Sequence, residues 1–126
     1  MRAIDTNVVV RMILRDDLPQ AVAADEFVRM GAWISTLVLA EAVWKLGREH
    51  ELKPAELATA IEMLLNHRSV VLQDAETVKD ALNLFRARPG LGFSDCLIIA
   101  LARKAGHVPL GTFDRRLANA EGAQKI

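Results

Sequence analysis

The sequence has one cysteine, no tyrosine, two tryptophans and four phenylalanines in its 126 residues. A single thiol, Cys96, excludes an internal disulfide and a zinc site built from cysteines. Neither sign of charge is in excess, because 16 Lys and Arg balance 16 Asp and Glu. This balance argues against a protein covered in positive charge, such as a non-specific DNA packager, but it does not describe local clusters.

Long hydrophobic runs are also missing. The longest, such as residues 37–40 and 96–102, fall far short of the roughly 20 apolar residues that span a bilayer. Asp5 interrupts the first apolar stretch and no small-residue cleavage site follows, so we expect no signal peptide. The sequence lacks repeats and linkers rich in Gly, Pro or Ser, which predicts one cytoplasmic domain over residues 1–126.

The rest of the composition is ordinary for a folded protein, with 52% apolar and 25% charged residues. Short apolar segments alternate with longer segments of helical periodicity, which favours βαβ units and a mostly parallel sheet. The expected strands cover residues 2–4, 32–34, 70–72, 108–110 and, as an edge strand, the tail at 123–126. The expected helices cover a segment after Asp5, residues 18–30, 36–51, 54–67, 75–87 and 95–105, and a short segment after Asp114.

Residues typical of helix ends support these boundaries. Prolines stand at two helix starts, where a missing N–H costs nothing (Pro19 and Pro54). Glycines stand just past two helix ends (Gly31 and Gly106). The expected N-caps are Ser35 or Thr36, Asp74 and Ser94. The stretch RPGLG is expected to be a loop.

Four acids are expected to meet at one edge of the sheet. Asp5 follows the first strand and Asp114 follows the strand at 108–110, and parallel strands share the edge at their carboxyl ends. Glu41 and Asp95 lie early in helices that begin at the same edge. Short polar residues near these acids, suited to a metal water or a phosphate oxygen, are Asn7, Ser94 and Thr112.

Carboxylates gathered in this way need a cation. At about 4 Å two of them repel by several kcal/mol if the effective dielectric constant is about 20. They stay ionised together only around a positive ion. Oxygen ligands without a His or Cys pattern suit Mg²⁺ or Mn²⁺. Such ions promote hydrolysis of phosphodiester bonds, which is the chemistry that we expect.

Each acid also has a structural explanation. The alternatives are a strand-ending turn for Asp5, a solvated helix position for Glu41, a first-turn charge answering the helix dipole for Asp95, and an N-cap for Asp114. The apolar neighbours of Glu41 predict an inward or half-buried side chain instead. For Asp114 the structural and the catalytic roles can hold at once.

The segments around these acids carry a family resemblance. IDTNVVV, LAEAVW, GFSDCLIIALARKAG and GTFDRRL, in this order, resemble the PIN-domain ribonucleases, and specifically the VapC-type toxins of bacterial toxin–antitoxin pairs. The resemblance covers essentially the whole chain, and FSDCLIIALA followed by TFD is its most specific part. One position differs, since Cys96 stands where the family more often has Ala.

The resemblance implies a three-layer α/β/α sandwich with a short, mostly parallel sheet of four or five strands. It implies Mg²⁺- or Mn²⁺-dependent cleavage of RNA, with tRNA and rRNA both suitable targets. It also implies a cognate antitoxin protein and a toxin homodimer. The acidic roles fall on Asp5, Glu41, Asp95 and Asp114, and the supporting polar roles on Thr112 and Asn7.

Basic and aromatic residues have two interpretations each. The candidates for RNA contacts are Arg11, Arg15, Arg115 and Arg116, which otherwise form a solvated face. Lys45 stands four residues after Glu41 and can form a structural ion pair with it. Trp33 and Trp44 can stack on bases, but packing in the core is the favoured interpretation in a chain with so few aromatic residues.

A second class of function stays open, namely a binding module without nuclease activity. A receiver-like phospho-acceptor domain would use Asp74, near the end of the strand at 70–72. Against it, no acidic pair stands at Asp5 and no Lys lies on the strand at 108–110. A degenerate PIN scaffold is a further alternative, which the full set of four acids disfavours.

Overall fold

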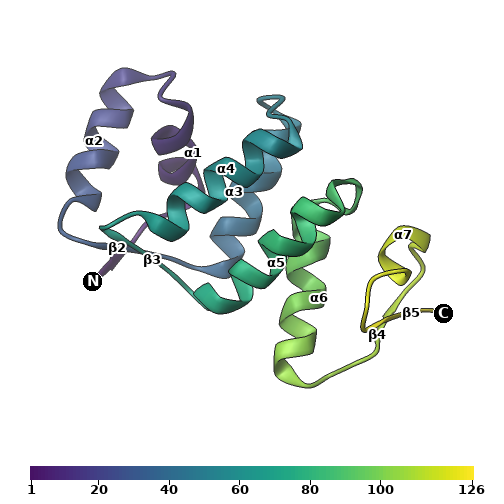
Figure 1. Cartoon of the computed structure of the whole chain (residues 1–126). Helices are drawn as coiled ribbons and strands as arrows, with labels where there is room; N and C mark the ends of the chain where they lie inside the picture. The colour runs from purple at the N-terminus through teal and green to yellow at the C-terminus, as the bar shows by residue number, and fades with distance from the viewer. The chain divides into compact units, whose positions relative to one another are not determined.

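Three parallel strands form the sheet of the first part of the chain in the computed structural model, which describes all 126 residues (Figure 1). They are β1 (Arg2–Ala3), β2 (Ala32–Ile34) and β3 (Val70–Leu72), in the spatial order β1-β2-β3. Arg2 is aligned with Ala32, and Ala32 with Val70, so the strands begin level with one another. Each connection between neighbouring strands contains two helices, as parallel pairing requires a long crossover.

Four helices pack on and beside this sheet. They are α1 (Thr6–Leu14) and α2 (Leu18–Val28) before β2, and α3 (Thr36–Arg48) and α4 (Pro54–Asn66) before β3. α1 contacts α2 and α3, and α4 contacts α3 and β3. The largest fully buried side chains here are all aliphatic: Val9, Val28, Ile34, Leu39, Leu46, Ile61 and Leu64. Burial of each stabilises the fold by about 1.5–3 kcal/mol before conformational entropy is counted.

Side-chain caps fix where the first three helices begin. Asp5, Asp17 and Ser35 each accept a hydrogen bond from the backbone N–H three residues ahead. Each cap satisfies one of the N–H groups that a first helical turn leaves unpaired, which is worth about 1 kcal/mol. The predicted cap at Ser35 is therefore confirmed.

The chain divides into two compact units, residues 1–75 and residues 76–126. The second unit contains most of α5 (Ala75–Ala87), the 3₁₀ turn η1 (Pro89–Leu91), α6 (Phe93–Ala105), β4 (Leu110–Thr112), α7 (Arg115–Ala118) and β5 (Ala123–Lys125). β4 and β5 pair in parallel. Phe85 and Phe93 meet edge to face, with ring centroids 5.9 Å apart, and this contact joins α5 to the start of α6.

The predicted α/β class is confirmed, because seven helices alternate with five strands and every strand pair is parallel. The strands at 32–34 and 70–72 have the predicted bounds. Gly106 ends α6 in the left-handed conformation, with φ of 80°, as expected for a residue past a helix end. None of the seven helices is long and apolar enough to cross a lipid bilayer.

Several predicted boundaries are wrong, for local reasons. The strand predicted at 108–110 runs from Leu110 to Thr112, because Pro109 has no N–H and Leu110 is the first residue that donates, to the Gly122 carbonyl. Ser94 does not cap α6, which begins one residue earlier at Phe93, after Gly92 with φ of 78°. The helix predicted to reach residue 51 ends at Arg48, and the RPGLG loop contains the 3₁₀ turn η1.

Candidate functional site

Asp5 lies at the carboxyl end of β1 and begins α1. The backbone still follows the sheet at Ile4, whose N–H donates to the Trp33 carbonyl at 3.1 Å. One carboxylate oxygen of Asp5, Oδ1, accepts a hydrogen bond from the Val8 N–H at 3.3 Å. The residue is exposed, and no basic side chain of residues 1–75 forms an ion pair with it. Its second oxygen is therefore available to a ligand at the end of the sheet where ligands of parallel folds bind.

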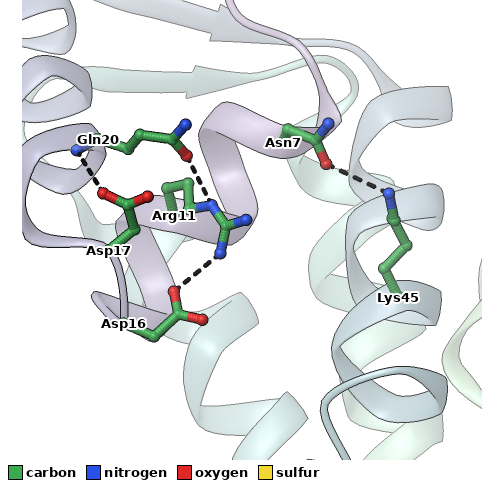
Figure 2. Close-up of polar contacts among 6 residues, drawn as sticks. All are labelled: Asn7, Arg11, Asp16, Asp17, Gln20 and Lys45. Carbon is green, nitrogen blue, oxygen red and sulfur yellow. Dashed lines mark hydrogen bonds and ion pairs between the residues drawn. The ribbon is translucent and has the colours of Figure 1, made fainter.

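Glu41 lies on the exposed side of α3, so the expectation of an inward or half-buried side chain is wrong. The buried side of this helix consists of Leu39, Ala42, Val43 and Leu46. The expected Glu41–Lys45 ion pair is also absent. Lys45 Nζ donates instead to Asn7 Oδ1 at 3.2 Å (Figure 2) and lies 4.0 Å from a Glu49 carboxylate oxygen. The Lys45–Asn7 hydrogen bond connects the start of α1 to α3, one helical turn after Glu41. The Glu41 carboxylate therefore has no cationic partner in its unit.

A cleft of about 560 Å³ opens beside Asp5, between α1 and α2. This volume is within the range of roughly 300–1,000 Å³ found for ligand pockets. Its polar lining residues are Asp5, Asn7, Arg11 and Gln20, and its apolar ones are Ala3, Ile4, Val8, Ala23, Ala24 and Phe27. The sequence did not predict this cleft, since helical periodicity shows which residues face inward but not where two helices leave a gap.

The two arginines of this region both have acidic partners. Arg11 donates to Gln20 Oε1 at 2.8 Å and to Asp16 Oδ1 at 2.9 Å (Figure 2). Arg15 donates to both carboxylate oxygens of Asp25, at 3.1 and 2.8 Å. This two-fold contact lowers the pKa of Asp25. Arg11 and Arg15 thus connect α1 to α2 and to the turn between these two helices.

In the second unit, Asp95 and Asp114 lie close enough to interact through their charges. Asp95 is the third residue of α6 and is half-buried. Burial raises the pKa of Asp95, and the negative charge of Asp114 raises it further. No basic side chain of residues 76–126 forms an ion pair with either carboxylate. A cation placed beside the two acids would remove this repulsion.

Asp114 is held by the start of α7. Its Oδ1 accepts hydrogen bonds from the backbone N–H groups of Arg116 at 2.7 Å and Leu117 at 3.1 Å. Its own N–H donates to Thr112 Oγ1 at 3.0 Å. The N-cap expected as a structural role is therefore confirmed. Because both cap bonds end on Oδ1, the second oxygen of the exposed side chain is left for another ligand.

The predicted supporting residues lie next to the acids along the chain. Asn7 is exposed at the first turn of α1, Ser94 is half-buried immediately before Asp95, and the Thr112 hydroxyl contacts the backbone of Asp114. Their proposed supporting role stays a prediction. The structure shows no contact of Ser94 with the first turn of α6 that would make it a cap.

Cys96 and the two tryptophans were predicted to pack in the hydrophobic core. Cys96 is buried, and burial together with the charge of Asp95 raises the pKa of its thiol to about 11. It therefore stays protonated at neutral pH, which confirms a core residue and not a nucleophile. Trp44 is 55% exposed on α3, so its assignment to the core is wrong, whereas Trp33 in β2 is half-buried.

Arg88 is not among the residues that the sequence predicted for the site. A cleft of about 200 Å³ in the second unit is lined by Arg88, Gly90, Leu91 and Arg116. Arg88 Nη2 donates to the Arg116 carbonyl at 3.0 Å across this turn. The RPG sequence at residues 88–90 was the one signal that could have identified it. A turn directly after a helix can bring the last basic residue of that helix close to the segment that packs on the turn.

The donor atoms of the four acids fit a hard divalent cation. Asp5 and Glu41 lie in the first unit and Asp95 and Asp114 in the second, and neither unit contains a group of three or more His, Cys, Asp or Glu side chains that could hold a metal ion. Asp5 and Asp114 each keep one carboxylate oxygen outside their helix caps. Oxygen donors of this kind favour Mg²⁺ or Mn²⁺ over zinc or copper.

Comparison with known families gives one finding. A family model described as PIN domain matches residues 3–123, which is nearly the whole chain. PIN domains are generally nucleases that depend on divalent metal ions and act on RNA. A search among curated proteins finds no match.

Proposed function

The chain belongs to the PIN domain family, and we propose on this premise that it is a Mg²⁺- or Mn²⁺-dependent endoribonuclease. It hydrolyses phosphodiester bonds of single-stranded or structured RNA, and its metal ligands are Asp5, Glu41, Asp95 and Asp114. The observation that carries the proposal is the pair Asp95 and Asp114. One carboxylate raises the pKa of the other, and no ion pair within their unit compensates either.

An uncompensated acidic pair is costly for a fold and therefore points to function. Two other aspartates of the chain are neutralised by arginines, in the Arg11–Asp16 and Arg15–Asp25 pairs. Asp5 and Glu41 resemble Asp95 and Asp114 in this respect, since no cation of their unit pairs with them. The four residues that the family resemblance selects thus share one electrostatic property.

The division of labour in the proposed reaction follows from these contacts. When bound, the divalent ion supplies Lewis acidity and lowers the pKa of water. Asp114 is oriented by the backbone of α7 through Oδ1, and Asp5 by the Val8 N–H, so both present a fixed second oxygen. Asn7, Ser94 and Thr112 hold a water or a phosphate oxygen beside the acids. The products are expected to carry a 5′-phosphate and a 3′-hydroxyl.

The test uses the purified full chain and an end-labelled, unstructured RNA. We expect cleavage with Mg²⁺ or Mn²⁺, none with excess EDTA, and none for Asp5→Asn or Asp95→Asn, with circular dichroism unchanged. Asp80→Asn is the matched control, because Asp80 is an exposed carboxylate on α5 outside the proposed set. Cleavage that survives in both Asp5→Asn and Asp95→Asn overturns the site, and a wild type without metal-dependent cleavage overturns the function.

The finer part of the proposal concerns biology. We propose that the enzyme is the toxin of a toxin–antitoxin pair, that it acts in the cytoplasm as a homodimer, and that a cognate antitoxin protein restrains it. Support comes from the VapC-like segments around the four acids and from the harm that a free ribonuclease does to its host. Its target is tRNA or rRNA. Induced expression should arrest growth, and 5′-end mapping of total RNA should give discrete cleavage sites in one of these targets.

Two results contradict this part without touching the nuclease chemistry. Growth that continues when cleavage-competent protein accumulates argues against a toxin. A monomer by light scattering at all concentrations tested argues against the homodimer. For the alternative receiver-like function, incubation with acetyl phosphate should leave Asp74 unmodified, as the PIN family match predicts.

A further inference from the structure

The second unit contains a cleft whose basic lining is not part of the proposed metal site. The arginine cleft, as we name it, is bounded by Arg88, Gly90, Leu91 and Arg116 and measures about 200 Å³. We propose that the arginine cleft binds a phosphate group of the RNA backbone next to the one that is cleaved. This inference rests on the proposed ribonuclease function and adds to it the element that holds the substrate chain.

The charge of the arginine cleft points to an anion. Two positively charged guanidinium groups line one small cleft. No carboxylate of residues 76–126 forms an ion pair with either group. Arg11, Arg15 and Arg29 differ in this respect, because each of them pairs with an acid. An anion between Arg88 and Arg116 would convert their mutual repulsion into attraction.

The arrangement of donors suits phosphate. Arg88 uses one N–H, on Nη2, to hold the Arg116 carbonyl at 3.0 Å, and this bond fixes its half-buried side chain beside α7. Its remaining N–H groups and those of Arg116 donate to no acceptor within residues 76–126, so oxygen atoms of a ligand can accept from them. Gly90 lies beside the second guanidinium, since a Cβ there would be in van der Waals contact with Arg116 Nη1, at 3.9 Å.

The position of the arginine cleft beside the acids identifies the anion as part of the RNA. Arg116 is two residues after Asp114, and its backbone N–H donates to the Asp114 carboxylate. Arg88 reaches the same turn, because its Nη2 donates to the Arg116 carbonyl at 3.0 Å. A chain whose scissile phosphate lies at Asp95 and Asp114 therefore brings a neighbouring phosphate to the two arginines, whose planar forks match phosphate oxygens.

The test measures binding without cleavage. Fluorescence anisotropy of a short labelled single-stranded RNA is followed with the full chain in EDTA, at several salt concentrations. The variants are Arg88→Gln, Arg116→Gln and the double variant. The matched control is Arg103→Gln, which removes the same charge from the other end of α6, eight residues or about 12 Å from Asp95.

We expect each single substitution to weaken RNA binding roughly tenfold, as loss of a charge-assisted contact does. If both arginines hold one phosphate, the double variant loses much less than the product of the two single losses. The slope of log K against log salt should fall by about 0.7 in either single variant and no further in the double variant, because one phosphate contact is lost in each case. Arg103→Gln should weaken binding less than either.

Several results would overturn the proposal. The first is a wild type that binds no RNA. The second is a loss of RNA affinity in Arg88→Gln and Arg116→Gln that is no larger than the loss in Arg103→Gln. The third is a double variant whose loss of affinity equals the product of the two single losses and whose salt slope falls by twice the single change. Competition by polyglutamate as strong as by RNA would make the ligand a protein and also overturn it. Arg116→Gln keeps the Arg88 bond to the Arg116 backbone, so its effect separates ligand binding from folding.

The outcome also stays distinct from that of the nuclease test. If the wild type cleaves no RNA but the two arginine variants lose affinity and the control does not, the arginine cleft stands and the proposed function fails. If cleavage depends on Asp5 and Asp95 but the arginine variants bind RNA like the control, the nuclease stands and the arginine cleft is refuted.

Discussion

Asp114 has a structural and a proposed catalytic role that two substitutions can separate. The cap of α7 needs a hydrogen-bond acceptor, whereas the metal site needs a negative charge. Asp114→Asn keeps an oxygen in the place of Oδ1 but removes the charge, and Asp114→Ala removes both. The two variants should therefore lose activity to the same extent and differ in stability.

The magnitude follows from the two cap bonds, at 2.7 Å to Arg116 N–H and 3.1 Å to Leu117 N–H. Loss of an N-cap costs about 0.5–2 kcal/mol. Asp114→Ala leaves two N–H groups unpaired, which favours the upper part of that range, but it also removes the repulsion that raises the Asp95 pKa. We expect a net loss of about 1 kcal/mol, or a melting temperature lower by about 4 °C for a chain of this size.

For Asp114→Asn we expect a melting temperature equal to or slightly above that of the wild type, because Asn caps helices as well as Asp does and the repulsion with Asp95 is gone. Thermal unfolding by circular dichroism and cleavage of labelled RNA with Mg²⁺ are the two measurements. Wild-type cleavage by Asp114→Asn would refute the need for charge at this position. An Asp114→Asn variant as unstable as Asp114→Ala would show that charge, and not the hydrogen bonds, makes the cap.

Two further predictions concern the charge of the site. Burial and the Asp114 charge raise the Asp95 pKa above its ordinary 3.8, so folding favours protonated Asp95 and the wild type loses stability as pH rises through the raised pKa. Asp95→Asn should therefore melt higher than the wild type at pH 7, with the difference vanishing below the ordinary pKa; a difference that does not change with pH contradicts this. Mg²⁺ at ten times its dissociation constant should stabilise the wild type by about 1.4 kcal/mol. The same stabilisation in Asp95→Asn would show that the metal binds elsewhere.

The elements of the fold that the sequence predicted are those with local signals. Ser35 begins α3 and Gly106 ends α6 because a hydroxyl acceptor and a left-handed backbone are properties of single residues. The strand at 32–34 lies between two local signals of this kind, Gly31 and Ser35, and has the predicted bounds. β4 starts two residues later than predicted, because Pro109 has no N–H and Leu110 is the first residue that donates to the segment leading into β5.

The sequence could predict which residue types form the candidate site, but not how exposed each of their side chains is. Glu41 was expected to face inward because its neighbours are apolar, yet Leu37 and Trp44 on the same helix are themselves 76% and 55% exposed. Apolar residues on both sides of α3 remove the contrast that periodicity depends on. Arg88 was missed for a different reason, since its approach to Arg116 joins residues 28 positions apart in the sequence.

Charge pairing separates Asp16 and Asp25 from the candidate metal ligands, and only the structure supplies that distinction. In the sequence, Asp16 and Asp114 look alike, because each stands next to an arginine. Burial raises the pKa of Asp16, but the hydrogen bond and charge of Arg11 lower it by more. Burial also raises the pKa of Asp95, and the charge of the Asp114 carboxylate raises it further. Whether an acid forms a stabilising ion pair or is left to bind a metal cation therefore depends on the side chain that faces it in space, and not on the residue next to it in the sequence.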